Sequence, residues 1–179
     1  PAGTFAVTAL TANRNVDALA AAARHHRAEI AVIADPACYQ RLADALAGTG
    51  VEAAAGPAGL LEAADREVDC VMGAIVGAAG LEPTLAAARR ADRLALANKE
   101  SLVLAGQLLL DLAAAHGGQL FPVDSEHAAI HQCLLGADPT AVRRLYLTAS
   151  GGALRDLPID QMAEVTPERA VLAHLDGSC

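Results

Sequence analysis

Short apolar runs alternate with longer segments rich in alanine and leucine along most of the chain. The short runs have the length of strands, and the longer segments repeat their apolar residues with the period of a helix. Consecutive parallel strands need a crossover between them, and that crossover is usually a helix. The alternation therefore predicts an α/β fold, with a mostly parallel sheet that carries helices on both faces.

The predicted strands occupy residues 5–10, 29–34, 51–55, 68–76, 93–97, 120–123 and 144–148, of which 51–55 is a short edge strand. The predicted helices occupy residues 16–25, 36–47, 82–90, 99–116 and 125–135, with a short one near Leu60 and another beginning at Pro167. The run 68–76 is continuously apolar, which is typical of a strand buried on both faces. The regular alternation stops near Val123, so we expect one domain over residues 1–123 and the beginning of a second over residues 124–179.

Composition excludes several classes of protein. The chain has 13 Lys and Arg against 21 Asp and Glu, a formal charge of −8, which argues against nucleic acid as a partner. Its four cysteines show no Cys-x-x-Cys spacing, which suggests neither a zinc site nor a redox pair and is typical of a reducing cytosol. No run of 18 apolar residues is present, so we expect a cytoplasmic protein with no membrane partner.

Unusual residues follow several of the predicted strands. Ligands of open parallel sheets bind beyond the carboxyl ends of the strands, so these residues are candidates for one site. The segments are Asn-Arg-Asn at 13–15, Gly-Ala-Ala-Gly at 77–80, Asn-Lys-Glu-Ser at 98–101 and Asp-Ser-Glu-His at 124–127. Ser150 and two glycines follow the last predicted strand, where they can present backbone N–H groups to an anion or form a plain turn.

The first two segments suit a phosphorylated nucleotide. A cation such as Arg14 at a strand end can pair with a phosphate on the adenosine ribose, which distinguishes NADP from NAD. The small residues at 77–80 let the backbone approach a planar ring or a phosphate closely. The structural alternatives are a polar loop in which Asn15 caps a helix, and a tight turn between strand and helix.

The other two segments carry charge. Lys99 can neutralise an oxygen of a substrate, or it simply begins a helix whose dipole Glu100 complements. Asp124 and Glu126 are two residues apart, so in an extended segment both carboxylates project to one side. Two converging oxygen ligands suit Mg²⁺ or Mn²⁺, whereas the alternative is a polar cap before the following helix. Ser125 would cap that helix or contact a ligand.

Four segments stand out together: residues 72–84 (MGAIVGAAGLEPT), 96–103 (LANKESLV), 122–127 (PVDSEH) and 148–152 (TASGG). In this order they resemble the 1-deoxy-D-xylulose-5-phosphate reductoisomerase family. The resemblance implies a Rossmann-like domain that binds NADPH, followed by the start of an α+β catalytic domain. It also implies conversion of 1-deoxy-D-xylulose 5-phosphate, a phosphorylated ketose, to 2-C-methyl-D-erythritol 4-phosphate in the non-mevalonate isoprenoid pathway. The implied metal is Mn²⁺ or Mg²⁺, and a full-length member is a homodimer.

The same resemblance assigns roles to individual residues. The implied NADPH contacts are Asn13, Arg14, Asn15, Asn98 and Glu100. The implied substrate contacts are Lys99, Ser125, Glu126, Ser150 and His174. Asp124 and Glu126 match metal ligands, and together with Lys99 they are the implied catalytic residues.

The chain also departs from the family pattern. The family opens with a glycine-rich turn that cradles the cofactor pyrophosphate, and it carries a third carboxylate ligand and a helical domain downstream; we expect this chain to lack all of them. Residues 173–179 stand where the family has a His-Pro-x-Trp-x-Met-Gly loop. Two alternatives to the enzyme follow. One is a non-catalytic, truncated nucleotide-binding module, and the other is a different NADP-dependent dehydrogenase, which would have no need of the acidic pair.

Overall fold

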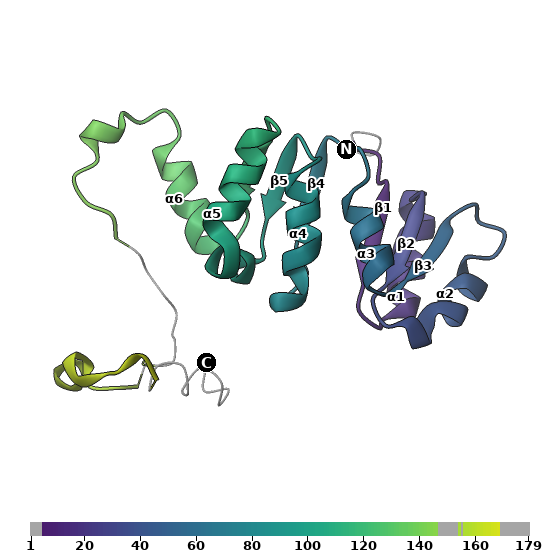
Figure 1. The fold of residues 1–179 in the computed structure, drawn as a ribbon, viewed down its shortest axis with the longest axis horizontal. Helices are drawn as coiled ribbons and strands as arrows, with labels where there is room; N and C mark the ends of the chain where they lie inside the picture. Colours follow the sequence, from purple (N-terminus) through teal and green to yellow (C-terminus); the bar gives the residue numbers. More distant parts are fainter. Residues whose placement is uncertain (1–4, 147–153, 155, 169–179) are drawn as a thin grey trace. The chain divides into compact units, whose positions relative to one another are not determined.

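The computed structural model describes residues 5–146, 154 and 156–168. The chain divides into two units, Pro1–Asp124 and Ser125–Cys179. The strands of the part described all belong to the first unit, where they pair in parallel in two sheets of three strands (Figure 1). This arrangement confirms the predicted α/β class with parallel strands.

The first sheet has the strand order β1-β2-β3. Its strands are β1 (Ala9–Ala12), β2 (Ile30–Ile33) and β3 (Glu52–Ala55). The connecting helices are α1 (Val16–His26), the 3-10 turn η1 (Pro36–Cys38) with α2 (Tyr39–Leu46), and then α3 (Gly56–Ala64). Pro36 lies in the first turn, where its missing N–H costs no hydrogen bond, as the sequence predicted.

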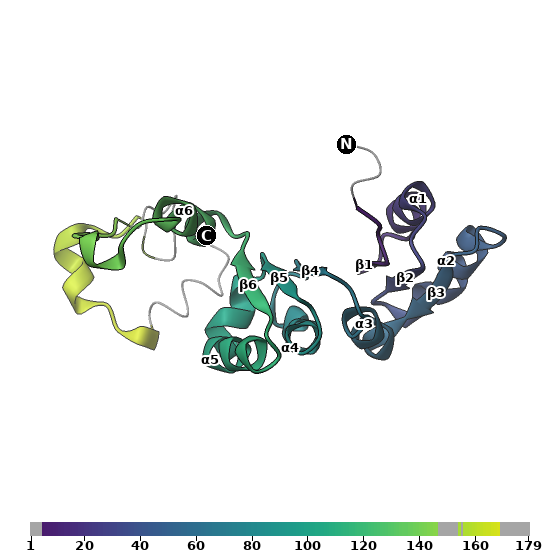
Figure 2. The same cartoon turned by 90° about the horizontal axis from the view of Figure 1, so that it is seen from above.

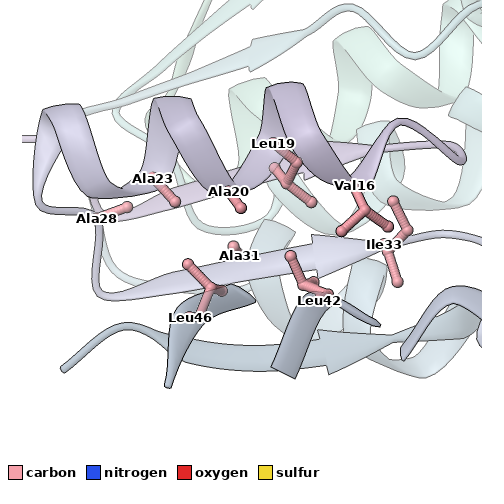
Figure 3. Packing of buried hydrophobic residues seen from close by; sticks show 9 residues of the cluster. All are labelled: Val16, Leu19, Ala20, Ala23, Ala28, Ala31, Ile33, Leu42 and Leu46. Carbon is pink, nitrogen blue, oxygen red and sulfur yellow. The ribbon is translucent and has the colours of Figure 1, made fainter. Parts of the chain in front are cut away.

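The core of the first sheet surrounds its middle strand, β2, in which no residue is exposed. Successive side chains of a strand point to opposite faces. Ala31 and Ile33 pack with residues of α1 and α2, as Figure 3 shows. Ile30 and Val32 point to the other face and pack with Ala63 of α3. Helices therefore cover both faces of this sheet, as predicted.

The second sheet has the order β4-β5-β6. Its strands are β4 (Cys70–Gly73), β5 (Arg93–Leu96) and β6 (Gln119–Pro122). The 3-10 turn η2 (Ala78–Gly80) leads into α4 (Leu81–Ala88), and α5 (Lys99–Ala115) follows β5. Both helices lie on the same side of this sheet (Figure 2), where Leu94 and Leu109 are completely buried between them.

The prediction that residues 68–76 form a strand buried on both faces was wrong. The strand covers only Cys70–Gly73, and Met72 is 58% exposed on the face away from α4. Among the described residues β4 pairs with β5 alone and therefore lies at an edge of its sheet. An apolar run predicts that a strand forms but not how many neighbours the strand acquires.

Strand β1 begins four residues later than predicted. The backbone carbonyl of Thr8 accepts hydrogen bonds from the N–H groups of Glu29 and Ile30, and the paired register starts with Ala9 opposite Ile30. Phe5, which was expected to begin the strand, is 87% exposed. Apolar composition extends over residues 5–10, whereas strand pairing depends on where β2 provides a partner.

The second unit contains α6 (Ser125–Leu134) and two 3-10 turns, η3 (Pro139–Ala141) and η4 (Ile159–Glu164). The predicted strand at 144–148 is not observed: residues 144–146 have no regular structure, and 147–148 lie outside the described residues. The strands of the described part pair with one another within the first unit, and a strand without a partner is not stable in water. Residues 167–168 are helical, in keeping with the helix predicted from Pro167. Within the described residues, no helix is both long enough and apolar enough to span a membrane.

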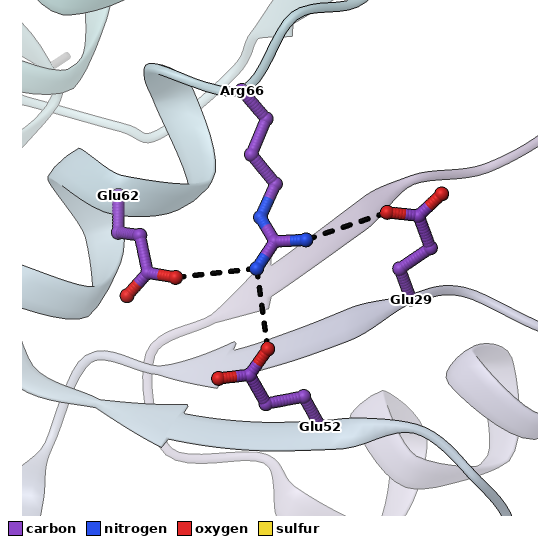
Figure 4. A network of polar contacts seen from close by, with 4 residues as sticks. All are labelled: Glu29, Glu52, Glu62 and Arg66. Atoms are coloured by element: carbon purple, nitrogen blue, oxygen red, sulfur yellow. Dashed lines mark hydrogen bonds and ion pairs between the residues drawn. The ribbon is translucent and has the colours of Figure 1, made fainter.

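Arg66 forms ion pairs that connect the amino-terminal edge of the first sheet with α3 (Figure 4). Its guanidinium lies 3.4 Å from Glu29, which precedes β2, and 3.2 Å from Glu52, the first residue of β3. It also lies 3.2 Å from Glu62, one helical turn earlier on α3. Three carboxylates around one cation leave an acidic edge, opposite the edge that holds the candidate site.

We predict that Leu42→Ala lowers the free energy of unfolding of the chain by about 2–5 kcal/mol, because Leu42 is completely buried between β2 and the surrounding helices. Denaturant-induced unfolding measures the change. The matched control is Leu108→Ala on α5, where the same side chain is 50% exposed and the loss should be less than half as large. Equal losses for the two variants would contradict the description of this core.

Candidate functional site

At the carboxyl edge of the first sheet, Asn13, Arg14 and Asn15 follow β1 and are all exposed. The backbone N–H of Asp35, just after β2, donates to the carbonyl oxygen of Asn13 at 3.1 Å. The two chain segments therefore remain side by side beyond the ends of their strands. The side-chain oxygen of Asn15 accepts from the N–H of Ala18 at 3.1 Å and caps α1, which is the capping role expected from its position.

Arg14 forms an ion pair with Asp35. The Nε of Arg14 lies 2.8 Å from Oδ2 of Asp35, and Oδ1 of Asp35 accepts from the backbone N–H of Ala37 at 2.9 Å. The Ala37 hydrogen bond is the main cause of a lowered pKa of Asp35, and Arg14 lowers the pKa further against an opposing effect of burial. Sequence reasoning did not single out Asp35, although the rule that polar residues follow strand ends would have found it.

At the carboxyl edge of the second sheet, a tight turn over residues 74–80 follows β4. Gly77 has a φ of +76°, a left-handed backbone conformation that favours glycine. A Cβ at Gly80 would overlap the carbonyl oxygen of Ile75 and approach the side-chain amide of Asn98. Both outer glycines are therefore needed for the turn itself, whatever ligand its backbone approaches.

Asn98 holds that turn in place. It is 97% buried, and its Nδ2 donates to the carbonyl oxygens of Ile75 at 2.6 Å and Gly77 at 3.1 Å. The same nitrogen lies 3.0 Å from Oε2 of Glu100. Its Oδ1 accepts from both the backbone N–H, at 2.8 Å, and the hydroxyl of Ser101, and so caps α5. The structure thus brings Asn98 and Glu100 together, and it engages the Asn98 amide with the chain's own backbone.

Lys99, on the first turn of α5, reaches across to the end of β6. Its Nζ lies 3.7 Å from Oδ2 of Asp124, whose side chain is only 13% exposed, whereas the Lys99 side chain is 61% exposed. The predicted cation and one predicted metal ligand are therefore neighbours in the first unit. At this distance the ion pair is loose and exposed at one end, so we assign it little stabilising effect.

The reasoning that placed Asp124 and Glu126 on one side of an extended segment was wrong. Helix α6 begins at Ser125, so Glu126 lies in the first helical turn. Residues two apart on a helix do not face each other, unlike those on a strand. In the second unit the hydroxyl of Ser125 donates to Oε2 of Glu126 at 2.9 Å. The spacing alone therefore does not argue for convergent carboxylates.

Two predicted residues, Ser150 and His174, lie outside the described residues. Within the described ranges, no group of three or more His, Cys, Asp and Glu side chains is arranged to hold a metal ion. A site built from this part of the chain therefore offers at most two such ligands.

Parallel strands joined by helices, with a glycine turn and an exposed cation beyond their carboxyl ends, define a Rossmann-like α/β protein. The model of the family 1-deoxy-D-xylulose 5-phosphate reductoisomerase matches residues 2–106, and the model of that enzyme's C-terminal domain matches residues 120–175. The chain belongs to the 1-deoxy-D-xylulose 5-phosphate reductoisomerase family, which confirms the resemblance seen in its sequence.

Individual relatives show the same relationship. The chain is 55% identical over 166 residues to 1-deoxy-D-xylulose 5-phosphate reductoisomerase of Ruegeria pomeroyi, a match that covers 93% of this chain and 42% of the relative. It is 56% identical over 167 residues to the reductoisomerase of Zymomonas mobilis, covering 93% of this chain and 43% of the relative. The chain thus spans less than half the length of these relatives.

Solved structures agree with the sequence relatives. The reductoisomerase of Zymomonas mobilis in complex with NADPH superimposes with a TM-score of 0.78 at 55% identity, over 93% of this chain and 44% of the solved one. A reductoisomerase in complex with NADPH, fosmidomycin and magnesium superimposes with a TM-score of 0.76 at 42% identity, over 94% and 44% of the two chains.

We predict that Asn98→Ala lowers the free energy of unfolding of the chain by about 1–3 kcal/mol, because the partly buried carbonyl groups of Ile75 and Gly77 lose their donor. Amide hydrogen exchange over residues 77–80 should also accelerate. Ser101→Ala is the matched control: it removes one of two donors to the Asn98 oxygen but leaves the turn held, so exchange there should change little. Unchanged exchange in Asn98→Ala would contradict the role of this amide.

Proposed function

We propose that this chain supplies the NADPH-binding domain, residues 1–123, and the beginning of the catalytic domain, residues 124–179, of a 1-deoxy-D-xylulose 5-phosphate reductoisomerase. The enzyme would convert that phosphorylated ketose to 2-C-methyl-D-erythritol 4-phosphate in isoprenoid synthesis. The observation that carries the proposal is the pairing of Lys99 with Asp124, beside the Asn98 turn, in a chain that matches the family over both of its domain models.

The residues at the strand ends fit NADPH. Arg14 offers an exposed cation after β1, suited to the phosphate of the adenosine ribose, with Asn13 and Asn15 on either side of it. Asn98 and Glu100 border the turn whose small residues let a ring or a phosphate approach the backbone. Bound NADPH would supply the hydride that reduces the substrate. Asn98 would then act mainly by shaping the turn that receives the cofactor.

The acidic segment fits a hard divalent cation. Asp124 and Glu126 carry carboxylate oxygens, which Mg²⁺ and Mn²⁺ prefer, and they match two metal ligands of the family pattern. A bound cation would polarise the substrate oxygens. Lys99 would place a second positive charge beside Asp124, where it can stabilise negative charge on the substrate.

The remaining roles follow the family pattern. Ser125 and Glu126 would contact the substrate at the start of α6, and Ser150 and His174 would contact it from the segments beyond the described residues. The net charge of −8 is consistent with a small phosphorylated substrate rather than nucleic acid, because the anion needs only local cations such as Lys99. A homodimer in the cytoplasm is the assembly and location we propose for the full-length enzyme.

One observation favours a second candidate, a non-catalytic nucleotide-binding module. The chain spans 42% of the length of a full reductoisomerase, and its described part gathers fewer than three metal-ligand side chains. Two ligands hold a metal weakly, and a partial site is poorly preorganised. The chain by itself would then bind nucleotide without turning substrate over.

We predict that Asp124→Asn, in a full-length enzyme that carries this sequence, reduces kcat by about 1,000-fold or more. Loss of a metal-ligand charge removes several kcal/mol of transition-state stabilisation, whereas NADPH binding should change little. Steady-state kinetics and NADPH fluorescence titration measure the two effects. Asp111→Asn, on the exposed side of α5, removes the same charge and should leave both unchanged. Normal turnover in Asp124→Asn would reject the assignment.

An activity assay of the isolated 179-residue chain distinguishes the two candidate functions. When the chain is mixed with NADPH, Mn²⁺ and 1-deoxy-D-xylulose 5-phosphate, it should oxidise little or no NADPH. The decrease in absorbance of the reduced nicotinamide measures this oxidation. The full-length enzyme carrying the same sequence should oxidise NADPH at a typical enzymatic rate. Rapid oxidation by the isolated chain would overturn the second candidate.

A further inference from the structure

The ion pair of Arg14 and Asp35 joins the carboxyl ends of β1 and β2, at the edge where an open parallel sheet binds its ligands. In that class an acidic residue accepts a hydrogen bond from the ribose 2′-hydroxyl of NAD, and an arginine nearby accommodates the 2′-phosphate of NADP. This chain has both kinds of residue. Its backbone keeps them adjacent, because the N–H of Asp35 donates to the carbonyl of Asn13.

The carboxylate is engaged at both of its oxygens. Oδ2 accepts from Arg14 at 2.8 Å and Oδ1 accepts from the backbone N–H of Ala37 at 2.9 Å. Those hydrogen bonds lower the pKa of Asp35, so the group is ionised at neutral pH. Asp35 therefore carries the negative charge that could accept a hydrogen bond from a ribose hydroxyl. However, one of its oxygens already accepts from Arg14 and the other from the backbone N–H of Ala37.

Arg14 donates to Asp35 through Nε, and its side chain is 77% exposed. A bond at Nε orients the guanidinium and uses its side edge, whereas the end edge, formed by one N–H of Nη1 and one N–H of Nη2, faces along the side chain away from Cδ. The hydrogen bond to Asp35 is donated by Nε, and the end edge is a fork that can bind a phosphate through two N–H groups.

We infer that Asp35 determines cofactor specificity: it orients Arg14 toward the 2′-phosphate of NADPH, and Arg14 in turn withholds Asp35 from the 2′-hydroxyl of NADH. The inference rests on the proposed binding of NADPH at this edge of the sheet. Both residues then contribute to discrimination between the cofactors. Arg14 attracts the 2′-phosphate of NADPH, and its pairing with Asp35 prevents that carboxylate from binding the 2′-hydroxyl of NADH.

The test compares dissociation constants for NADPH and NADH in a full-length enzyme that carries this sequence. Asp35→Asn keeps an oxygen for the Ala37 N–H but loses the charge that holds Arg14. NADPH should therefore bind about 3- to 10-fold more weakly than to the parent enzyme, whereas the affinity for NADH should stay about the same. Arg14→Ala should weaken NADPH about 10- to 100-fold and strengthen NADH about 10-fold, because it exposes the carboxylate. The gain for NADH is diagnostic, since loss of a cation alone would weaken any anionic cofactor.

The double variant Arg14→Ala with Asp35→Asn should lose the gain in NADH affinity. Asp17→Asn is the matched control, because it removes a carboxylate on the first turn of α1 that lies near Arg41 rather than Arg14. It should leave both constants unchanged. Thermal unfolding of each variant establishes that it is folded.

Two kinds of failure are distinguishable. A parent enzyme that binds NADPH no more tightly than NADH would overturn the proposed function and this inference together. A parent enzyme that prefers NADPH, but whose Asp35→Asn variant binds NADPH as tightly as the Asp17→Asn control or more tightly, would overturn the inference alone. An Arg14→Ala variant with no gain for NADH would also overturn it.

Discussion

Complete burial of β2 is the constraint on which the first sheet depends. A strand with no exposed residue must be covered on both faces and paired on both edges, because each unpaired backbone group in an apolar core costs about as much as a lost hydrogen bond. Helices α1 and α2 cover one face, and α3, which follows β3, covers the other. The carboxyl ends of β1 and β2 then share one edge, and Arg14 and Asp35 meet there as a consequence of the packing.

Asn98 has the corresponding role at the second sheet. A buried amide must satisfy two donors and an acceptor, and Asn98 does so by joining the β4 turn to the start of α5. The helix that it caps begins with Lys99, whose reach to Asp124 is thereby fixed at its base. One buried polar side chain thus sets the geometry of a turn suited to a cofactor and of a cation suited to a substrate.

The sequence predicted most elements of the first unit because periodicity and capping are local properties. Asn15 and Pro36 both stand where the structure places the beginning of a helix. It failed where the outcome depends on partners distant in the chain. The apolar run 68–76 does not reveal that β4 has one partner among the described strands. The helix from Ser125 was predicted, but the argument from the spacing of Asp124 and Glu126 assumed an extended segment there. Asp35 could have been found by its position after a predicted strand, but its ion pair with Arg14, 21 residues away, could not.

Electrostatics explains why an acidic chain would pair each cation of its candidate site with a carboxylate. With a net charge of −8, the average field around this chain opposes an anionic cofactor, so binding must rely on cations that are fixed at short range. A long arginine or lysine side chain loses rotamer freedom when it binds a phosphate, and a carboxylate that already restrains it reduces that loss. Asp35 restrains Arg14 and Asp124 lies beside Lys99. The nearby carboxylate weakens the net charge of each cation but fixes its position, and position matters more for recognising one phosphate than total charge does.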